Sequence, residues 1–117
     1  MTTLHESAAP NAAGYRDVTP SQVFARARHV HVVDVREPHE LAGELGRIAD
    51  AEHVPLATVL AAAPAWPKDA ELVLVCRSGA RSSQAATALT QRGFRRIMNM
   101  TGGMLAWNDA GLPIERG

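Results

Sequence analysis

Three short apolar runs divide the chain, and each has the near-continuous hydrophobic character of a strand that is buried on both faces. They cover residues 30–35, 72–75 and 97–100, where valine, leucine, isoleucine and methionine dominate. Strands of this kind belong to sheets that carry helices on both sides, and such sheets are mostly parallel. The hydrophobic pattern therefore predicts a parallel sheet at the centre of the molecule.

The segments around these runs carry helical signals. Thr19, Pro20 and Gln22 combine a capping box with a proline at the first helical position, which predicts a helix over residues 20–28. Over residues 81–92, one face repeats at helical spacing, and Gly93 stands where a terminating glycine belongs. That face consists of Ser82, Ala85, Ala86 and Leu89. Shorter helices are predicted over 38–41, 56–63 and 104–110.

This alternation predicts an α/β fold, a single domain whose mainly parallel central sheet is flanked by helices. Ligands of such sheets bind at the carboxyl ends of the strands, where the sequence places Asp34, Arg36, Cys76 and Gly102. The length of 117 residues fits one domain. Residues 1–14 are small and polar, so we expect a flexible N-terminal tail there and the folded domain over 15–117.

Composition excludes several classes of protein. The 12 basic and 12 acidic residues give no net charge, so we expect neither a nucleic acid nor a membrane surface as partner. One cysteine excludes an intramolecular disulfide and a cysteine-rich zinc site. His29 and His31 have no evident third ligand, so no metal and no cofactor are predicted. No secretion signal or membrane-length apolar run is visible, and a reducing, cytoplasmic location is expected.

The lone cysteine, Cys76, ends the second apolar run and is followed by a short loop and a helix. Gly79 permits positive φ, so successive backbone N–H groups of the loop can point inward as an anion-binding nest. The helix adds its positive end, and Arg77 and Arg81 add charge. Cysteines in such settings have pKa values of roughly 3.5–7.5. The loop is therefore suited to a thiolate nucleophile that handles anionic groups.

Other interpretations stay open at this stage. A cysteine at a strand end is often simply buried packing, although two flanking arginines and a nest argue against it here. Asp34 and Arg36 either order the rim of the site or form a structural ion pair, with Glu71 as one possible partner of Arg36. Arg81 either binds anionic donors or braces the loop. Gly102 and Gly103 either bring the chain close to the cysteine loop or make a plain turn.

Several motifs together resemble the single-domain rhodaneses, a family of sulfurtransferases. They are Asp34-Val35-Arg36-Glu37, the segment 46–55, Cys76-Arg77-Ser78-Gly79-Ala80-Arg81-Ser82, and Gly102-Gly103 with Trp107. The resemblance spans about residues 15–115 and implies a rhodanese-like domain in which Cys76 carries sulfane sulfur as a persulfide. It also implies that residues 77–82, namely Arg77, Ser78, Gly79, Ala80, Arg81 and Ser82, bind substrate, with Asp34 and Arg36 in support.

The chain departs from the family in the segment 46–55, where Arg47 and Asp50 replace the usual histidine and second glycine. We expect this to change the local shape of the segment or its partner surface. Phosphatases of the same fold have a longer loop, whereas Cys76 to Arg81 is six residues. A smaller ring of amides suits sulfur better than a tetrahedral phosphate, so the loop length favours sulfur transfer over phosphatase chemistry.

The sequence thus predicts a thiosulfate:cyanide-type sulfurtransferase that moves sulfane sulfur from thiosulfate or a persulfide to a thiophilic acceptor through Cys76. Because there is no second cysteine, the acceptor must be external: cyanide in an assay, a small thiol or a partner protein. The alternative is a sulfur-carrier or interaction module that a partner protein loads and that turns over thiosulfate poorly.

Overall fold

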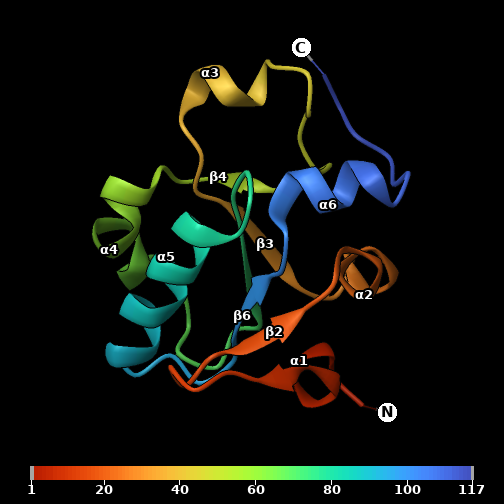
Figure 1. Ribbon diagram of the computed structural model, residues 1–117. Helices are drawn as coiled ribbons and strands as arrows, with labels where there is room; N and C mark the ends of the chain where they lie inside the picture. Colours follow the sequence, from red (N-terminus) through yellow and green to blue (C-terminus); the bar gives the residue numbers. More distant parts are fainter. Residues whose placement is uncertain (1, 117) are drawn as a thin grey trace.

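A computed structural model describes residues 2–116 and contains a six-stranded sheet with the strand order β1-β2-β6-β5-β3-β4 (Figure 1). All pairings are parallel except that of β1 with β2. This confirms the predicted α/β fold with a mainly parallel sheet. The strands are β1 (Ala9–Pro10), β2 (Arg16–Val18), β3 (His31–Asp34), β4 (Glu52–His53), β5 (Leu72–Val75) and β6 (Ile97–Met100).

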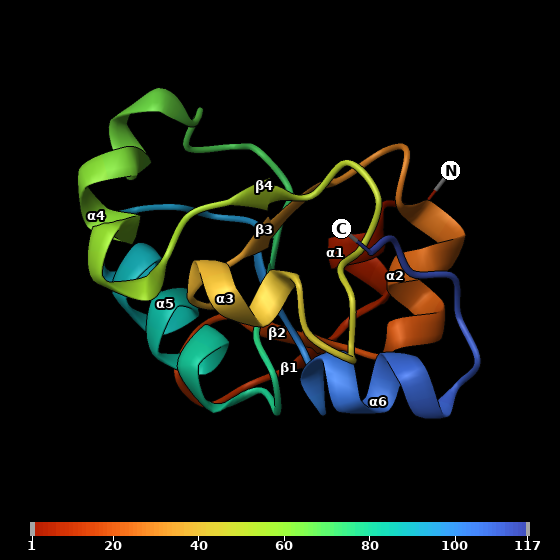
Figure 2. The same ribbon diagram turned by 90° about the horizontal axis from the view of Figure 1, so that it is seen from above.

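Helices cover both faces of the sheet. One layer contains α4 and α5, the other contains α1, α2 and α6, and α3 lies across the carboxyl edge of the strands (Figures 1 and 2). Two short 3₁₀ turns, η1 and η2, flank α4. The bounds are α1 (Leu4–Ser7), α2 (Pro20–Arg26), α3 (Pro38–Leu41), η1 (Leu56–Thr58), α4 (Val59–Ala62), η2 (Ala63–Ala65), α5 (Ala80–Gln91) and α6 (Gly103–Asp109).

The central strand β5 shows why the apolar runs are continuous. Leu72 and Leu74 pack into the core under α4 and α5, while Val73 and Val75 pack into the core under α2 and α6. All four side chains are fully buried, so each residue of the strand needs an apolar side chain whichever way it points. The neighbouring strand β6 is buried along its whole length in the same way.

The helix after the cysteine loop lies directly on this sheet. The buried residues of α5 are Ser82, Ala85, Ala86 and Leu89, the face that the sequence spacing predicts. Gly93 follows the helix with φ +92°, the left-handed conformation expected of a terminating glycine. The close seat of α5 on the sheet brings its first turn against the carboxyl end of β5.

Two helix predictions need adjustment. Thr19 and Gln22 form the predicted capping box of α2, but the helix ends at Arg26 rather than near residue 28. The helix predicted over 56–63 is instead a four-residue α-helix between 3₁₀ turns. Pro64 lies inside the second turn, and proline disrupts the hydrogen bonds of a continuing α-helix.

The N-terminal segment differs from the prediction of a flexible tail over residues 1–14. Within its described part, Thr3 and Glu6 form a capping box that starts α1, and the side chain of Leu4 is buried. Ala9 and Pro10 then pair with β2 in an antiparallel register. Strands of two and three residues are too short to carry a hydrophobic pattern, so β1 and β2 escape detection in the sequence. The boundary between tail and domain at residue 15 stays a prediction.

Candidate active site

Cys76 directly follows β5, at the carboxyl edge of the sheet, and α3 lies beyond this edge (Figure 1). Its loop turns into α5 at Gly79, which has φ +105°. This positive φ is strained for residues with a side chain, which explains the glycine. The turn directs the backbone N–H of Gly79 back toward the sulfur, as the predicted nest requires.

The sulfur of Cys76 is enclosed by hydrogen-bond donors. The Gly79 N–H donates to Sγ at 3.0 Å, and the Ser82 hydroxyl lies 3.3 Å from Sγ. Burial raises the pKa of Cys76, but hydrogen bonds from the Ser82 side chain and from the backbone of Ser82, Gly79 and Ser78 outweigh it. The pKa is therefore lowered, so the thiolate forms more readily than in a free cysteine although the residue is only 1% exposed.

Gly103 brings a second backbone segment against this loop. The N–H groups of Met104 and Leu105 donate to the carbonyl oxygens of Cys76 and Arg77 at 2.8 and 3.0 Å. A methyl group added at Gly103 would lie 2.5 Å from both carbonyl oxygens. The sequence left open whether Gly102 and Gly103 bring the chain close to the cysteine loop or make a plain turn. The structure shows the close approach.

Arg81 has a partner that the sequence does not reveal. Its guanidinium donates to both carboxylate oxygens of Glu40 on α3, at 2.6 and 2.8 Å. Hydrogen bonding from Arg81 lowers the pKa of Glu40 to about 2. Arg81 thus braces α3 against α5, and most of its charge is neutralised. The lowered pKa of Cys76 comes from hydrogen bonds of the loop, which the sequence suggested together with the helix end and the charges of Arg77 and Arg81.

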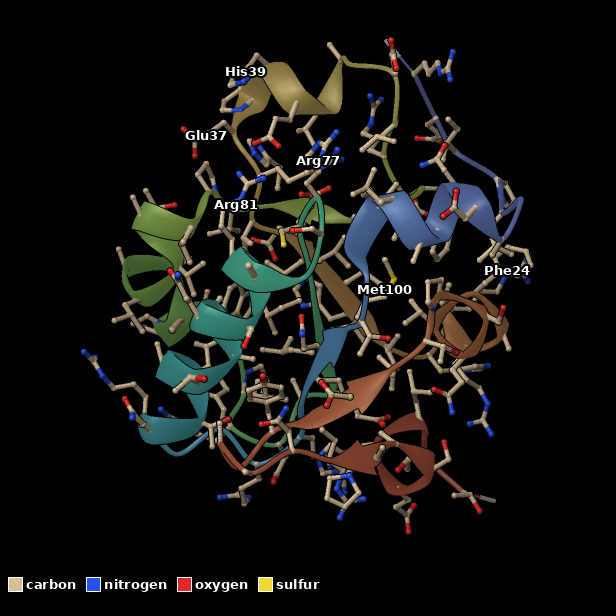
Figure 3. All side chains as sticks on the ribbon, viewed as in Figure 1. Phe24, Glu37, His39, Arg77, Arg81 and Met100 are labelled. Carbon is tan, nitrogen blue, oxygen red and sulfur yellow. The ribbon has the colours of Figure 1, made fainter. Side chains whose placement is uncertain are left out.

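The other loop residues divide into exposed and buried ones. Arg77, Ser78 and Ala80 are exposed at the mouth of the loop, and Ser82 is fully buried beneath it. Figure 3 shows Arg77 extending from the loop toward α3. Within residues 2–116, the Arg77 side chain takes part in neither a hydrogen bond nor an ion pair, so its charge is available at the mouth.

Asp34 and Arg36 form a buried ion pair at the end of β3. Arg36 donates from Nε and Nη2 to the Asp34 carboxylate at 2.8–3.1 Å and from Nη2 to the carbonyl oxygen of Gly46 at 2.8 Å. The suggested pairing of Arg36 with Glu71 is wrong, because Glu71 accepts from the backbone of His5. The pair therefore ties the segment around residue 46 to the end of β3.

Asn99 is a residue of the site that sequence reasoning missed. It is the polar residue of the otherwise apolar β6, and its side chain is buried. Its Oδ1 accepts from the Ser82 hydroxyl at 2.5 Å, and its Nδ2 lies 3.4 Å from the carbonyl oxygen of Gly79. Both residues that donate to the sulfur are thus tied to Asn99. An asparagine within an apolar strand is the signal that would have revealed it, because a buried amide needs partners.

The two unusual residues of the segment 46–55 adopt specific local structures. Arg47 forms an antiparallel bridge with Glu115, which ties the segment to the C-terminal end of the described chain. Asp50 has φ +65°, the left-handed conformation in which glycine is unstrained. The expected effect of Arg47 and Asp50 on the shape of the segment or its partner surface stays a prediction.

The histidines do not form a metal site. His31 contacts Glu52 at 2.7 Å, and His39 is exposed on α3. Between residues 2 and 116 there is no group of three or more His, Cys, Asp or Glu side chains arranged to hold a metal ion.

A parallel α/β sheet that presents a buried, hydrogen-bonded cysteine at the start of a helix defines a domain built around a loop thiolate. The chain belongs to the rhodanese-like domain family, whose model matches residues 20–110. This confirms the family to which the sequence motifs pointed. The helices of the described residues do not include one that is long and apolar enough to span a membrane.

Relatives agree with this assignment. A sulfurtransferase of Allochromatium vinosum is 44% identical over 80% of this chain and 86% of its own length. The thiosulfate sulfurtransferase GlpE of Vibrio cholerae is 29% identical over 85% and 92%. Among solved structures, a rhodanese-related protein of Thermoplasma volcanium has a TM-score of 0.77 at 29% identity, covering 85% of this chain and 96% of that protein. These relatives support a rhodanese-type role in sulfur transfer.

Proposed function

We propose that this protein is a sulfurtransferase that moves sulfane sulfur through a persulfide on Cys76. The observation that carries the proposal is the sulfur site itself: a buried Sγ with a lowered pKa, held by the Gly79 N–H and close to the Ser82 hydroxyl. A thiolate is the form of cysteine that attacks sulfur. Positioned donors stabilise it without having to reorganise.

The first half-reaction loads the sulfur. The Cys76 thiolate attacks the outer sulfur of thiosulfate, a new S–S bond forms, and the bond between the two sulfurs of the donor breaks. Sulfite leaves with the electron pair, and Cys76 becomes a persulfide anion. A persulfide donor loads Cys76 in the same way and leaves as a thiolate. The exposed guanidinium of Arg77 attracts the anionic donor to the mouth of the loop.

The second half-reaction unloads it. An acceptor such as cyanide or a thiolate attacks the outer sulfur, the S–S bond breaks, and its electron pair returns to Sγ as the thiolate. The two steps make a ping-pong cycle with a covalent intermediate. We assign substrate binding to Arg77 and to the loop backbone from Ser78 to Ser82, and give Arg81, Asp34 and Arg36 the role of holding that loop and its rim. The cytoplasmic location stays a prediction.

The test combines turnover with detection of the intermediate. Thiocyanate production from thiosulfate and cyanide is measured for the wild type and for Cys76→Ser, while mass spectrometry follows the addition of one sulfur atom. We expect turnover and the added sulfur in the wild type and neither in Cys76→Ser, because a hydroxyl is not ionised at neutral pH. Appreciable turnover by a folded Cys76→Ser protein would refute the proposal.

The same experiment separates the sulfur-carrier alternative. A carrier would accept sulfur from a persulfide donor and show the added mass, yet produce thiocyanate from thiosulfate only slowly. The relevant comparison is the rate of loading from thiosulfate against the rate of loading from a persulfide. Loading that succeeds only from a persulfide would replace the thiosulfate part of the proposal and leave the role of Cys76 intact.

A further inference from the structure

A cavity of about 350 Å³ adjoins the cysteine loop on the side of α3 and α6. Arg77 and Leu105 lie in its wall, and the Leu105 N–H donates to the Arg77 carbonyl oxygen at 3.0 Å. The wall of the cavity therefore includes the residue that directly follows Cys76. Its volume is at the lower end of the range for pockets that bind small molecules, roughly 300–1,000 Å³.

The charges in the wall of this cavity decide what it would bind. Four charged residues line it, and two of them are engaged elsewhere: Arg36 with Asp34, and Glu40 with Arg81. The remaining two, Arg77 and Glu44, are exposed. Among residues 2–116, neither of these two side chains takes part in an ion pair or a hydrogen bond. The cavity thus offers one available guanidinium and one available carboxylate.

Two leucines give the cavity wall an apolar part. Leu45 and Leu105 line the cavity together with the two available charges. One cation, one anion and an apolar surface within a small cavity complement a short zwitterion with a hydrocarbon or thiol body. A dianion such as thiosulfate gains from Arg77 but is repelled by Glu44. The cavity is therefore better matched to an acceptor than to that donor.

We propose that this cavity selects zwitterionic aminothiols as sulfur acceptors, with the acceptor's carboxylate on Arg77 and its ammonium group on Glu44. This inference rests on the proposed function, because it assigns the acceptor for the persulfide of Cys76. The acceptor thiolate attacks the outer sulfur, one S–S bond forms, and the bond to Sγ breaks. The products are the acceptor persulfide anion and the Cys76 thiolate, so charge and electrons balance.

Three acceptors of similar size separate the two contacts. Cysteine carries both charged groups, 3-mercaptopropionate lacks the ammonium group, and cysteamine lacks the carboxylate. Protein loaded with thiosulfate and freed of excess donor is mixed with each acceptor, and the loss of the persulfide is followed in a single turnover. Each variant is compared with the wild type for the same acceptor, so that differences in thiol reactivity cancel.

Two variants are expected to give opposite patterns. Glu44→Gln should slow transfer to cysteine and cysteamine about two- to fivefold, the range that exposed ion pairs support, with a smaller effect on 3-mercaptopropionate. Arg77→Gln should slow transfer to cysteine and 3-mercaptopropionate by a similar factor, with a smaller effect on cysteamine. The control is Asp109→Asn on α6, an exposed residue outside the cavity wall that undergoes the same change of charge.

The outcomes distinguish the two proposals. Failure of thiosulfate and of persulfide donors to load Cys76 refutes the proposed function and this inference with it. Normal loading followed by equal effects of Glu44→Gln on all three acceptors overturns the acceptor cavity alone. Equal patterns for Glu44→Gln and Asp109→Asn also overturn it, because the effect would then come from overall charge and not from a contact.

Discussion

Replacing Ser82 by alanine should raise the pKa of Cys76, because the variant removes the hydroxyl that lies 3.3 Å from Sγ. A hydrogen bond to a charged group contributes about 1.5–3 kcal/mol, and one pKa unit corresponds to about 1.4 kcal/mol, which together give about one to two units. The Ser82 hydroxyl has a single proton, however, and the Asn99 and Gly79 oxygens also accept it. This competition places the expected rise near the lower value, about one unit.

The pKa of Cys76 is read from the rate of alkylation by iodoacetamide as a function of pH. The midpoint should move upward by about one unit, so alkylation at neutral pH slows by up to about tenfold. The two rates should converge at pH values above both midpoints, where the thiolate is fully formed in both proteins. Alanine fits the buried small-residue face of α5, so the fold should survive.

Ser83→Ala is the matched control. It removes the same hydroxyl one position further along α5, where Ser83 contacts the Tyr15 hydroxyl at 2.7 Å rather than the sulfur. Stability should fall in this variant without a shift of the alkylation midpoint. A midpoint that stays in place, or moves downward, in Ser82→Ala would show that the Ser82 hydroxyl does not stabilise the thiolate.

Two further predictions concern the contacts that hold the loop. Glu40→Gln should lower the free energy of unfolding by about 1–3 kcal/mol at neutral pH. Because the pKa of Glu40 falls from 4.5 to about 2 on folding, the stability from its ionised form is complete above pH 4.5 and disappears as the pH drops through 2. If the unfolding free energies of the wild type and Glu40→Gln differed equally at all pH values, the stabilisation would not come from the ionised form of Glu40. Gly103→Ala should cost at least about 2 kcal/mol in urea unfolding, since strain at φ +58° adds to contacts of 2.5 Å, whereas Gly93→Ala, with open space around it, should cost less. Equal losses in the two glycine variants would mean that the close approach to the loop adds nothing.

The elements that could be predicted from the sequence are those with a clear hydrophobic pattern. The strand ending at Val75, the loop from Cys76 and the helix that follows are local in sequence, and each carries its own signal: a buried run, a glycine turn and a repeating helical face. Local signals of this kind fix an element wherever the rest of the chain goes. The family motifs lie on these same elements, which is why the position of Cys76 could be predicted together with the fold.

Contacts between distant segments were not predictable in the same way. Arg81 and Glu40 are 41 residues apart, and neither residue type indicates which of many charged partners it meets. Arg36 shows that the choice of partner is open even locally, because it pairs with Asp34 two positions away and not with Glu71. Charged side chains are long and abundant, so their pairing is decided by where the backbone folds. The need of Asn99 for a partner could be predicted, because a polar side chain within a buried strand indicates a polar group in contact with it.

Burial of Cys76 has a consequence for how the proposed cycle would proceed. The thiolate is stabilised by donors that also cover it, so Sγ itself is almost inaccessible, with 1% of the residue exposed. A persulfide moves the reactive atom away from Sγ by one S–S bond, about 2 Å. In the proposed cycle the negative charge would move with it to the outer sulfur. Loading would then convert a covered nucleophile into a sulfur farther from the donors that cover Sγ, and unloading would return the charge to the position where the loop stabilises it. The same enclosure that limits access to the free thiolate thus favours reaction at the outer sulfur over attack at Sγ.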